Sequence, residues 1–87
     1  MISIQFLNSP GCSECEKAKI ILNEVKSLYP KVEIKEIDVM SLKGLTLATE
    51  HGIMTNPGII VNGELFSAGS LDRNKLITKI KSLQNSS

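Results

Sequence analysis

The segment "NSPGCSECEKAK", residues 8–19, contains both cysteines of the chain. Cys12 and Cys15 are separated by two residues and follow a Pro-Gly pair, which is typical of a turn. From Cys12 onward the apolar residues have the spacing of an amphipathic helix, so the cysteine pair is predicted at a helix start. Three roles fit two cysteines at this spacing: a redox couple, half of a metal site, or a structural disulfide.

The structural disulfide is the least favoured role. A bridge between Cys12 and Cys15 would close a very short loop, which stabilises a fold less than a long loop does. The start of the chain, "MISIQFLNSP", lacks the charged region, long apolar stretch and cleavage site of a secretory signal. We therefore expect a cytoplasmic protein, and the cytoplasm keeps thiols reduced.

Length and composition predict one small domain, residues 1–87, with residues 84–87 frayed at its end. The chain is 41% hydrophobic, which is enough for a single core. No apolar run reaches the roughly 18 residues of a membrane span, so we expect no membrane association. Ten basic and nine acidic residues give a net charge of +1, with no block of either sign. Nucleic-acid binding, which needs clustered basic charge, is therefore not expected.

Apolar periodicity predicts the first three elements. Residues 2–7, "ISIQFL", alternate as a strand does, and residues 12–29 follow a helical period that Pro30 ends. Residues 31–39, "KVEIKEIDV", form a second strand whose apolar side chains change face between Lys35 and Glu36. That change indicates either a bulge or burial on both faces. The inward stripe of the helix is expected to contain Ala18, Ile21, Leu22, Val25 and Leu28.

The rest of the chain predicts a helix, a hairpin and a final helix. Residues 42–50 form the second helix, with Ser41 as its N-cap and Gly52 at its end. Leu42, Leu45 and either Thr49 or Ala48 are expected to face inward. Residues 58–69, "GIIVNGELFSAG", have two apolar runs around Asn-Gly, the preferred pair of a type I′ hairpin turn. The final helix starts at Ser70 or Asp72 and packs through its apolar stripe, Leu76, Ile77, Ile80 and Leu83.

The element order is therefore β-α-β-α-β-β-α, an α/β fold. A strand–helix–strand unit joins parallel strands, and the hairpin adds antiparallel ones. The expected sheet is mixed and four-stranded, with helices on both faces.

On this map, Cys12 lies at the carboxyl end of the first strand and at the start of the first helix. The helix dipole and the free N–H groups favour a negative charge there, such as a thiolate. Cys15 lies one turn later on the same face, close enough to bond with Cys12. This arrangement suits thiol–disulfide exchange, in which Cys12 attacks a disulfide and Cys15 resolves the intermediate. Glu14 opposes the thiolate, and nearby lysines offset it.

A metal site within one chain needs more ligands than the sequence supplies. Structural zinc usually has four protein ligands, and the chain has two cysteines and one histidine, His51. A dimer could share two cysteine pairs around zinc or an iron–sulfur cluster. A non-enzymatic module, either such a dimer or an adaptor, therefore stays open as the alternative, and the favoured redox couple needs no cofactor.

Taken together, the motifs resemble the thioredoxin superfamily. Cys12 and Cys15 at a helix start are followed, about forty residues after Cys15, by Thr55-Asn56-Pro57, which leads into the Asn-Gly hairpin. The resemblance covers Ile2 to Leu83 and is greatest to the small thioredoxin-like, glutaredoxin-sized redox proteins of bacteria and archaea.

The resemblance implies a thioredoxin-like fold and an enzyme, a thiol–disulfide oxidoreductase acting on protein disulfides. It implies a cis Pro57 beside the cysteines and a substrate-binding stretch of Thr55, Asn56 and Pro57. Electrons would come from an external donor, either a flavin disulfide reductase or a low-molecular-weight thiol, and the protein would be a monomer. Met40 and Met54 are either soft apolar contacts beside this site or filling of the core and its rim.

Overall fold

The computed structural model describes residues 1–85, which form four strands and three helices in the predicted order. The elements are β1 (Ser3–Asn8), α1 (Ser13–Leu28), β2 (Glu33–Asp38), α2 (Leu42–His51), β3 (Gly58–Val61), β4 (Glu64–Ala68) and α3 (Arg73–Asn85).

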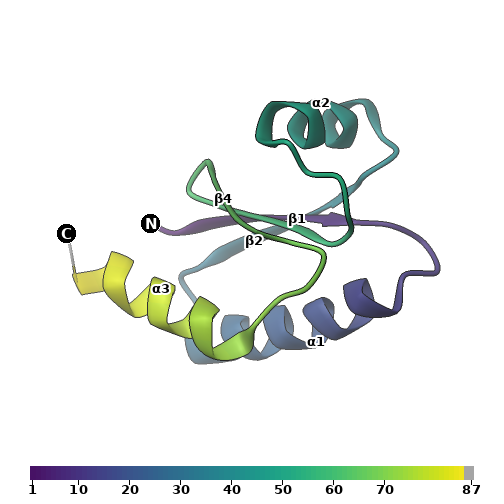
Figure 1. Cartoon of the computed structure of the whole chain (residues 1–87). Helices are drawn as coiled ribbons and strands as arrows, with labels where there is room; N and C mark the ends of the chain where they lie inside the picture. Colours follow the sequence, from purple (N-terminus) through teal and green to yellow (C-terminus); the bar gives the residue numbers. More distant parts are fainter. Residues whose placement is uncertain (86–87) are drawn as a thin grey trace.

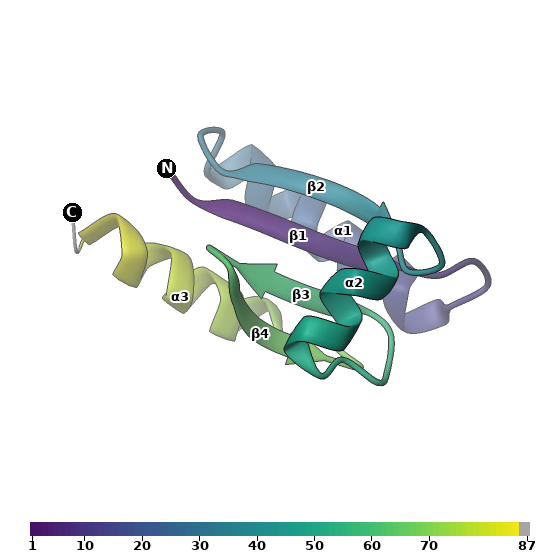
Figure 2. The ribbon, with the colours of Figure 1, turned by 90° about the horizontal axis from the view of Figure 1, so that it is seen from above.

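The strands form one sheet in the order β2-β1-β3-β4. β1 and β2 are parallel, whereas β1 with β3 and β3 with β4 are antiparallel. Helix α2 covers one face of the sheet, and α1 and α3 cover the other (Figures 1 and 2). The predicted mixed sheet with helices on both faces is therefore confirmed.

Two apolar clusters hold the layers together, one on each face. β1 contributes to both because its side chains alternate: Ile4 and Phe6 join the larger cluster beneath α1 and α3, and Leu7 joins the smaller one beneath α2. All four residues of β3 are buried, since this strand lies inside the sheet and is covered on both faces. Burial of these apolar side chains is the main favourable contribution to folding.

The change of face in β2 reflects burial on both sides of the strand. Its register with β1 is continuous from Ser3–Glu33 to Asn8–Asp38, so β2 contains no bulge. Ile34 packs against the larger cluster, and Ile37 belongs to the smaller one. The register shift of the sheet lies elsewhere, in the hairpin.

Helix α2 begins and ends as predicted but presents a different face to the sheet. The Ser41 hydroxyl accepts a hydrogen bond from the N–H of Gly44 at 3.0 Å, and Gly52 adopts the left-handed conformation at the helix end. Leu42 and Leu45 were predicted to face inward, which is wrong, because they are 83% and 47% exposed.

The reason for the different face is the close approach of α2 to the end of β2. Gly44 is buried there, and a Cβ atom at this position would lie 2.1 Å from the carbonyl oxygen of Asp38. The face with the glycine therefore meets the sheet edge. Ala48 packs against the smaller cluster, as predicted, and Leu47 packs there in place of Leu42 and Leu45.

Leu28 was also predicted to face inward, which is wrong. Leu28 is the last residue of α1 and is 55% exposed, whereas Tyr29, just beyond the helix, packs against the larger cluster.

The hairpin turn and the last helix agree with the sequence pattern. Asn62 and Gly63 both have positive φ, 50° and 81°, as a type I′ turn requires. Asp72 rather than Ser70 caps α3, since its Oδ1 accepts a hydrogen bond from the N–H of Lys75 at 3.0 Å.

Of the residues expected to fray, 84 and 85 belong to α3, and 86–87 lie outside the described residues. Within residues 1–85, no helix has the length and apolar character needed to cross a membrane.

Candidate functional site

Cys12 is the N-cap residue of α1, at the end of the loop that follows β1. Its backbone is extended, with φ −99° and ψ 112°, and its Sγ accepts a hydrogen bond from the N–H of Cys15 at 3.1 Å. The sulfur thus takes the place of the oxygen that usually caps a helix. At this position it lies at the positive end of the helix dipole, which stabilises a thiolate.

Cys15 lies one turn further along α1 and is only 2% exposed, whereas Cys12 is half-buried. Both cysteines are free thiols in this structure. Burial raises the pKa of the Cys15 thiol to about 11, and its hydrogen bond with the Cys12 side chain acts in the same direction. A hydrogen bond from the Ser9 backbone acts against this pKa increase. Cys15 is therefore a neutral thiol at physiological pH, shielded behind the more accessible Cys12.

The segment before β3 lies at the same end of the sheet as the cysteines. Gly58, the first residue of β3, pairs with Leu7 near the carboxyl end of β1, so the residues preceding β3 lie beside the loop that follows β1 (Figure 2). The Asn56–Pro57 peptide bond is cis, and the Pro57 side chain is fully buried. Thr55 is exposed and Asn56 is half-buried.

The backbone of this segment has free hydrogen-bonding groups. Among the described residues, neither Thr55 nor Asn56 has a backbone hydrogen-bond partner. Since polar backbone groups need partners when they are covered, this short stretch is suited to pairing with another extended chain.

A third segment, which the sequence reasoning did not assign to the site, lies against Thr55 and Pro57. Gly69 ends the hairpin, and its N–H donates to the carbonyl oxygen of Pro57 at 2.9 Å. Gly69 has φ +95°, and a Cβ atom there would lie 2.9 Å from Thr55 Oγ1. The signal in the sequence was the glycine itself, which permits both the positive φ and the close approach.

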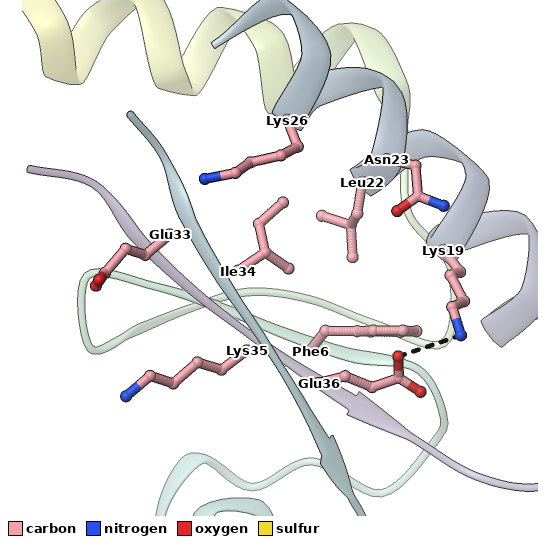
Figure 3. Close-up of a pocket in the computed structure, with 9 residues that line it drawn as sticks. All are labelled: Phe6, Lys19, Leu22, Asn23, Lys26, Glu33, Ile34, Lys35 and Glu36. Atoms are coloured by element: carbon pink, nitrogen blue, oxygen red, sulfur yellow. Dashed lines mark ion pairs between the residues drawn. The ribbon is translucent and has the colours of Figure 1, made fainter. Parts of the chain in front are cut away.

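Two lysines of α1 close to the cysteines form ion pairs. Lys17 Nζ lies 3.3 Å from Glu14 Oε1, and Lys19 Nζ lies 3.4 Å from Glu36 Oε1. Lys17 therefore offsets Glu14, as the sequence suggested, but Lys19 pairs with β2 instead (Figure 3). Both pairs are exposed, so each contributes little to stability. The negative charge of Glu14 still adds to the raised pKa of Cys15.

The hollow drawn in Figure 3 lies between α1 and β2 and has a volume of about 410 Å³. Phe6, Leu22 and Ile34 form its apolar part, and charged side chains surround them. Neither cysteine lines this hollow, nor does any residue of the segment before β3, so it is separate from the candidate site.

His51 was considered with the two cysteines as a possible metal ligand. It lies in the last turn of α2. That helix is on the opposite face of the sheet from α1 and its cysteines (Figure 1). Within residues 1–85, no group of three or more histidine, cysteine, aspartate or glutamate side chains could hold a metal ion.

Comparison with known proteins agrees with this geometry. The family model for the thioredoxin domain matches residues 2–82. This chain belongs to the thioredoxin family. Its cysteine pair is the CxxC motif of a thioredoxin-like redox protein.

Archaeal thioredoxins are among the related sequences. The thioredoxin of Methanocaldococcus jannaschii is 35% identical over 81 residues, which covers 92% of this chain and 93% of that protein. A probable thioredoxin of Methanothermobacter thermautotrophicus is 30% identical over the same share of each chain. The resemblance to the archaeal and bacterial members of the superfamily is thus confirmed.

Solved structures show the same fold at low sequence identity. One, described as a malarial protein, has a TM-score of 0.75 at 18% identity and covers 94% of this chain and 96% of its own. Another, the malaria parasite thioredoxin-2, has a TM-score of 0.76 at 17% identity and covers 94% of this chain and 82% of its own. At these identities the likeness supports the thioredoxin fold alone.

Proposed function

We propose that this protein is a thiol–disulfide oxidoreductase that reduces disulfides in other proteins through Cys12 and Cys15. The observation that carries the proposal is the difference between the two sulfurs. Cys12 is half-buried and its Sγ caps α1, whereas Cys15 is buried one turn behind it. A nucleophile and a resolving thiol need this division of roles.

The reaction has two exchanges. In the first, the Cys12 thiolate attacks one sulfur of the substrate disulfide; a Cys12–substrate bond forms, the substrate S–S bond breaks, and the departing thiolate takes up a proton. In the second, Cys15 loses its proton and attacks Cys12 Sγ, which forms the Cys12–Cys15 disulfide and releases the other substrate thiol. Two electrons and two protons pass from the dithiol to the substrate.

Thr55, Asn56 and Pro57 form the proposed substrate-binding stretch. The free backbone groups of Thr55 and Asn56, and the place of the stretch at the same sheet end as Cys12, support this role. An extended substrate segment would pair with it as an added strand, which orients a disulfide toward Cys12.

An external donor must restore the dithiol after each cycle. We propose a flavin disulfide reductase or a low-molecular-weight thiol, and a protein that acts as a monomer without a cofactor. The thioredoxin relatives support a reductase partner of this general kind.

The test measures reduction of a protein disulfide in the presence of a limiting dithiol reductant. We expect the protein to accelerate this reduction and Cys12→Ser to lose the acceleration, whereas Ser27→Ala on the exposed side of α1 keeps it. Stoichiometric zinc or iron in protein purified without oxygen would instead favour a metal-binding module.

A further inference from the structure

Strand β2 lies at an edge of the sheet, with β1 on one side and no strand on the other (Figure 2). The N–H groups of Glu33 and Val39 donate to carbonyl oxygens at the two ends of β1, so the odd-numbered residues of β2 direct their backbone groups toward β1. Because these directions alternate along a strand, Ile34 and Glu36 direct theirs to the open side. Among residues 1–85, no partner bonds to the backbone of Ile34 or Glu36 on that side.

The hollow of Figure 3 lies along this open edge, between α1 and β2. Its floor is apolar and consists of Phe6, Leu22 and Ile34, and Ile34 is only half-buried. The ion pair of Lys19 and Glu36 lies beside this floor. A strand added to β2 would pair with its free backbone groups and cover the floor with its own side chains.

The charges of β2 restrict which strand can be added, since charged side chains on an edge strand normally oppose pairing. Side chains alternate here: Ile34 and Glu36 lie on the α1 face, and Glu33 and Lys35 lie on the other face with Ile37. Glu33 and Lys35 are exposed, and neither forms an ion pair within residues 1–85. A partner strand must therefore place opposite charges across from these two side chains.

A second copy of β2 does so in one antiparallel register only. For the free backbone groups of Ile34 and Glu36 to pair with those of a second copy, the two-fold axis must pass through Ile34, Lys35 or Glu36. An axis at Lys35 or at Glu36 places identical charges directly opposite each other, which destabilises a sheet. An axis at Ile34 places Glu33 of each copy opposite Lys35 of the other.

The register centred on Ile34 also suits the α1 face. Ile34 lies beside Ile34 of the second copy, and the two side chains cover the apolar floors of both hollows. Glu36 of the second copy faces Val32, whose carbonyl oxygen accepts a hydrogen bond from Lys26 Nζ. The carboxylate of that glutamate therefore comes beside the Lys26 ammonium group, and opposite charges adjoin on both faces of the sheet.

We propose that two copies of this protein associate by antiparallel pairing of their β2 strands, with the two-fold axis at Ile34, into one sheet with four strands from each copy. The centre of the pairing is remote from the cysteines, because Ile34 lies beside Ile4 near the start of β1 and Cys12 follows the other end of β1. Each copy keeps a complete site, so the monomer remains the catalytic unit. Self-association of this kind does not depend on the proposed function.

Sedimentation equilibrium measures the association in protein that is kept reduced, so that no disulfide joins two chains. One strand from each copy makes a small interface, and we expect a dimer with a Kd of about 0.1–1 mM. The weight-average mass should rise by about half between about 10 µM and about 1 mM protein. A mass that stays at that of one chain up to about 1 mM would overturn the proposal.

Charge variants identify the surface. Glu33→Lys and Lys35→Glu each place like charges across the pair, so each variant alone should stay monomeric. An equal mixture of the two should associate, because every charge then faces its opposite on the other variant. Lys81→Glu, the same change at an exposed position of α3, should keep the self-association.

All the altered side chains are exposed, so the variants should fold. The double variant Glu33→Lys, Lys35→Glu should dimerise as the unmodified protein does, and it tests the pairing if a single variant does not fold. A dimer that survives in both single variants, or a mixture or double variant that fails to associate, would overturn the pairing of β2 with β2.

Discussion

The backbone N–H of Cys15 donates a hydrogen bond to Cys12 Sγ at 3.1 Å, so each cysteine fixes the position of the other. The same bond makes Cys12 the cap of α1 and keeps its sulfur at the helix start, where a thiolate is stabilised. It also sets Cys15 one turn deeper, in the larger apolar cluster. The positions of the two thiols at the start of α1 therefore make Cys12 the capping sulfur and Cys15 the buried one.

The two thiols should differ in their reaction with an alkylating agent near neutral pH. Burial raises the pKa of Cys15 to about 11, so it stays protonated and shielded at about pH 7.5 in the folded, reduced protein. We expect iodoacetamide to modify Cys12 alone under these conditions, with Cys15 modified only as the pH approaches its pKa of about 11. Peptide mapping by mass spectrometry measures the modification of each cysteine. Equal modification of the two thiols near neutral pH would contradict the burial of Cys15.

Stability of the reduced protein should fall at alkaline pH because of Cys15. Its folded-state pKa of about 11 lies above the ordinary value of 9.0, so the folded state holds its proton more tightly than the unfolded state. The contribution is fully present below pH 9.0 and is lost as the pH rises from there through about 11. This contribution is measured by urea unfolding of the reduced protein and of Cys15→Ser at several pH values. The variant should lose less stability over that range, and parallel losses would argue against a raised pKa.

Gly69→Ala should weaken both the fold and substrate reduction. Alanine at φ +95° costs about 1–2 kcal/mol, and its Cβ would press on Thr55 Oγ1 at 2.9 Å. Gly63→Ala is the matched control, since Gly63 also has positive φ but a Cβ added there would meet no atom within 4 Å. We expect similar losses of unfolding free energy and a lower kcat/KM for Gly69→Ala alone. An unchanged kcat/KM would mean that Thr55 does not need this support.

Gly44→Ala should destabilise the protein although alanine is the better helix former. The added Cβ would lie 2.1 Å from Asp38 O, a backbone atom that cannot move without shifting the end of β2. We expect a loss of about 1–3 kcal/mol, as for other overpacked sites, against a helix-propensity gain of about 1 kcal/mol. Thr46→Ala, at an exposed position of the same helix, should change stability little. Thermal unfolding of the two variants measures both changes. A Gly44→Ala variant more stable than the unmodified protein would contradict the close approach of Gly44 to Asp38 O.

The element order and the place of Cys12 could be predicted from the sequence, because local signals set both. A turn pair followed by a helical period gives the start of α1, and Asn62-Gly63 gives the hairpin. The inward face of α2 could be predicted only in part: Ala48 does face inward, but Leu42 and Leu45 do not. The buried contact of Gly44 with the end of β2 outweighs the apolar pattern of the two leucines. From the sequence, Gly44 indicated only a lower helix propensity, but in the fold it determines which face of α2 packs on the end of β2.

The contacts that backbone groups make in the site could likewise not be predicted from the sequence. The Ser9 backbone reaches the Cys15 thiol, and Gly69 contacts Thr55 across two loops. The sequence gives no signal for the Ser9 contact, and a glycine at position 69 indicates that a close approach is possible but not which residue it meets.

The most direct test of the proposed chemistry uses the Cys15→Ser variant, which keeps the nucleophile and lacks the resolving thiol. Incubated with a protein disulfide and then quenched with acid, it should hold the substrate in a mixed disulfide on Cys12, seen by intact mass and released by dithiothreitol. Cys12→Ser should form no such adduct. An adduct absent from Cys15→Ser, or present at Cys15 in Cys12→Ser at a similar rate, would contradict the assignment of Cys12 as nucleophile and Cys15 as resolving thiol.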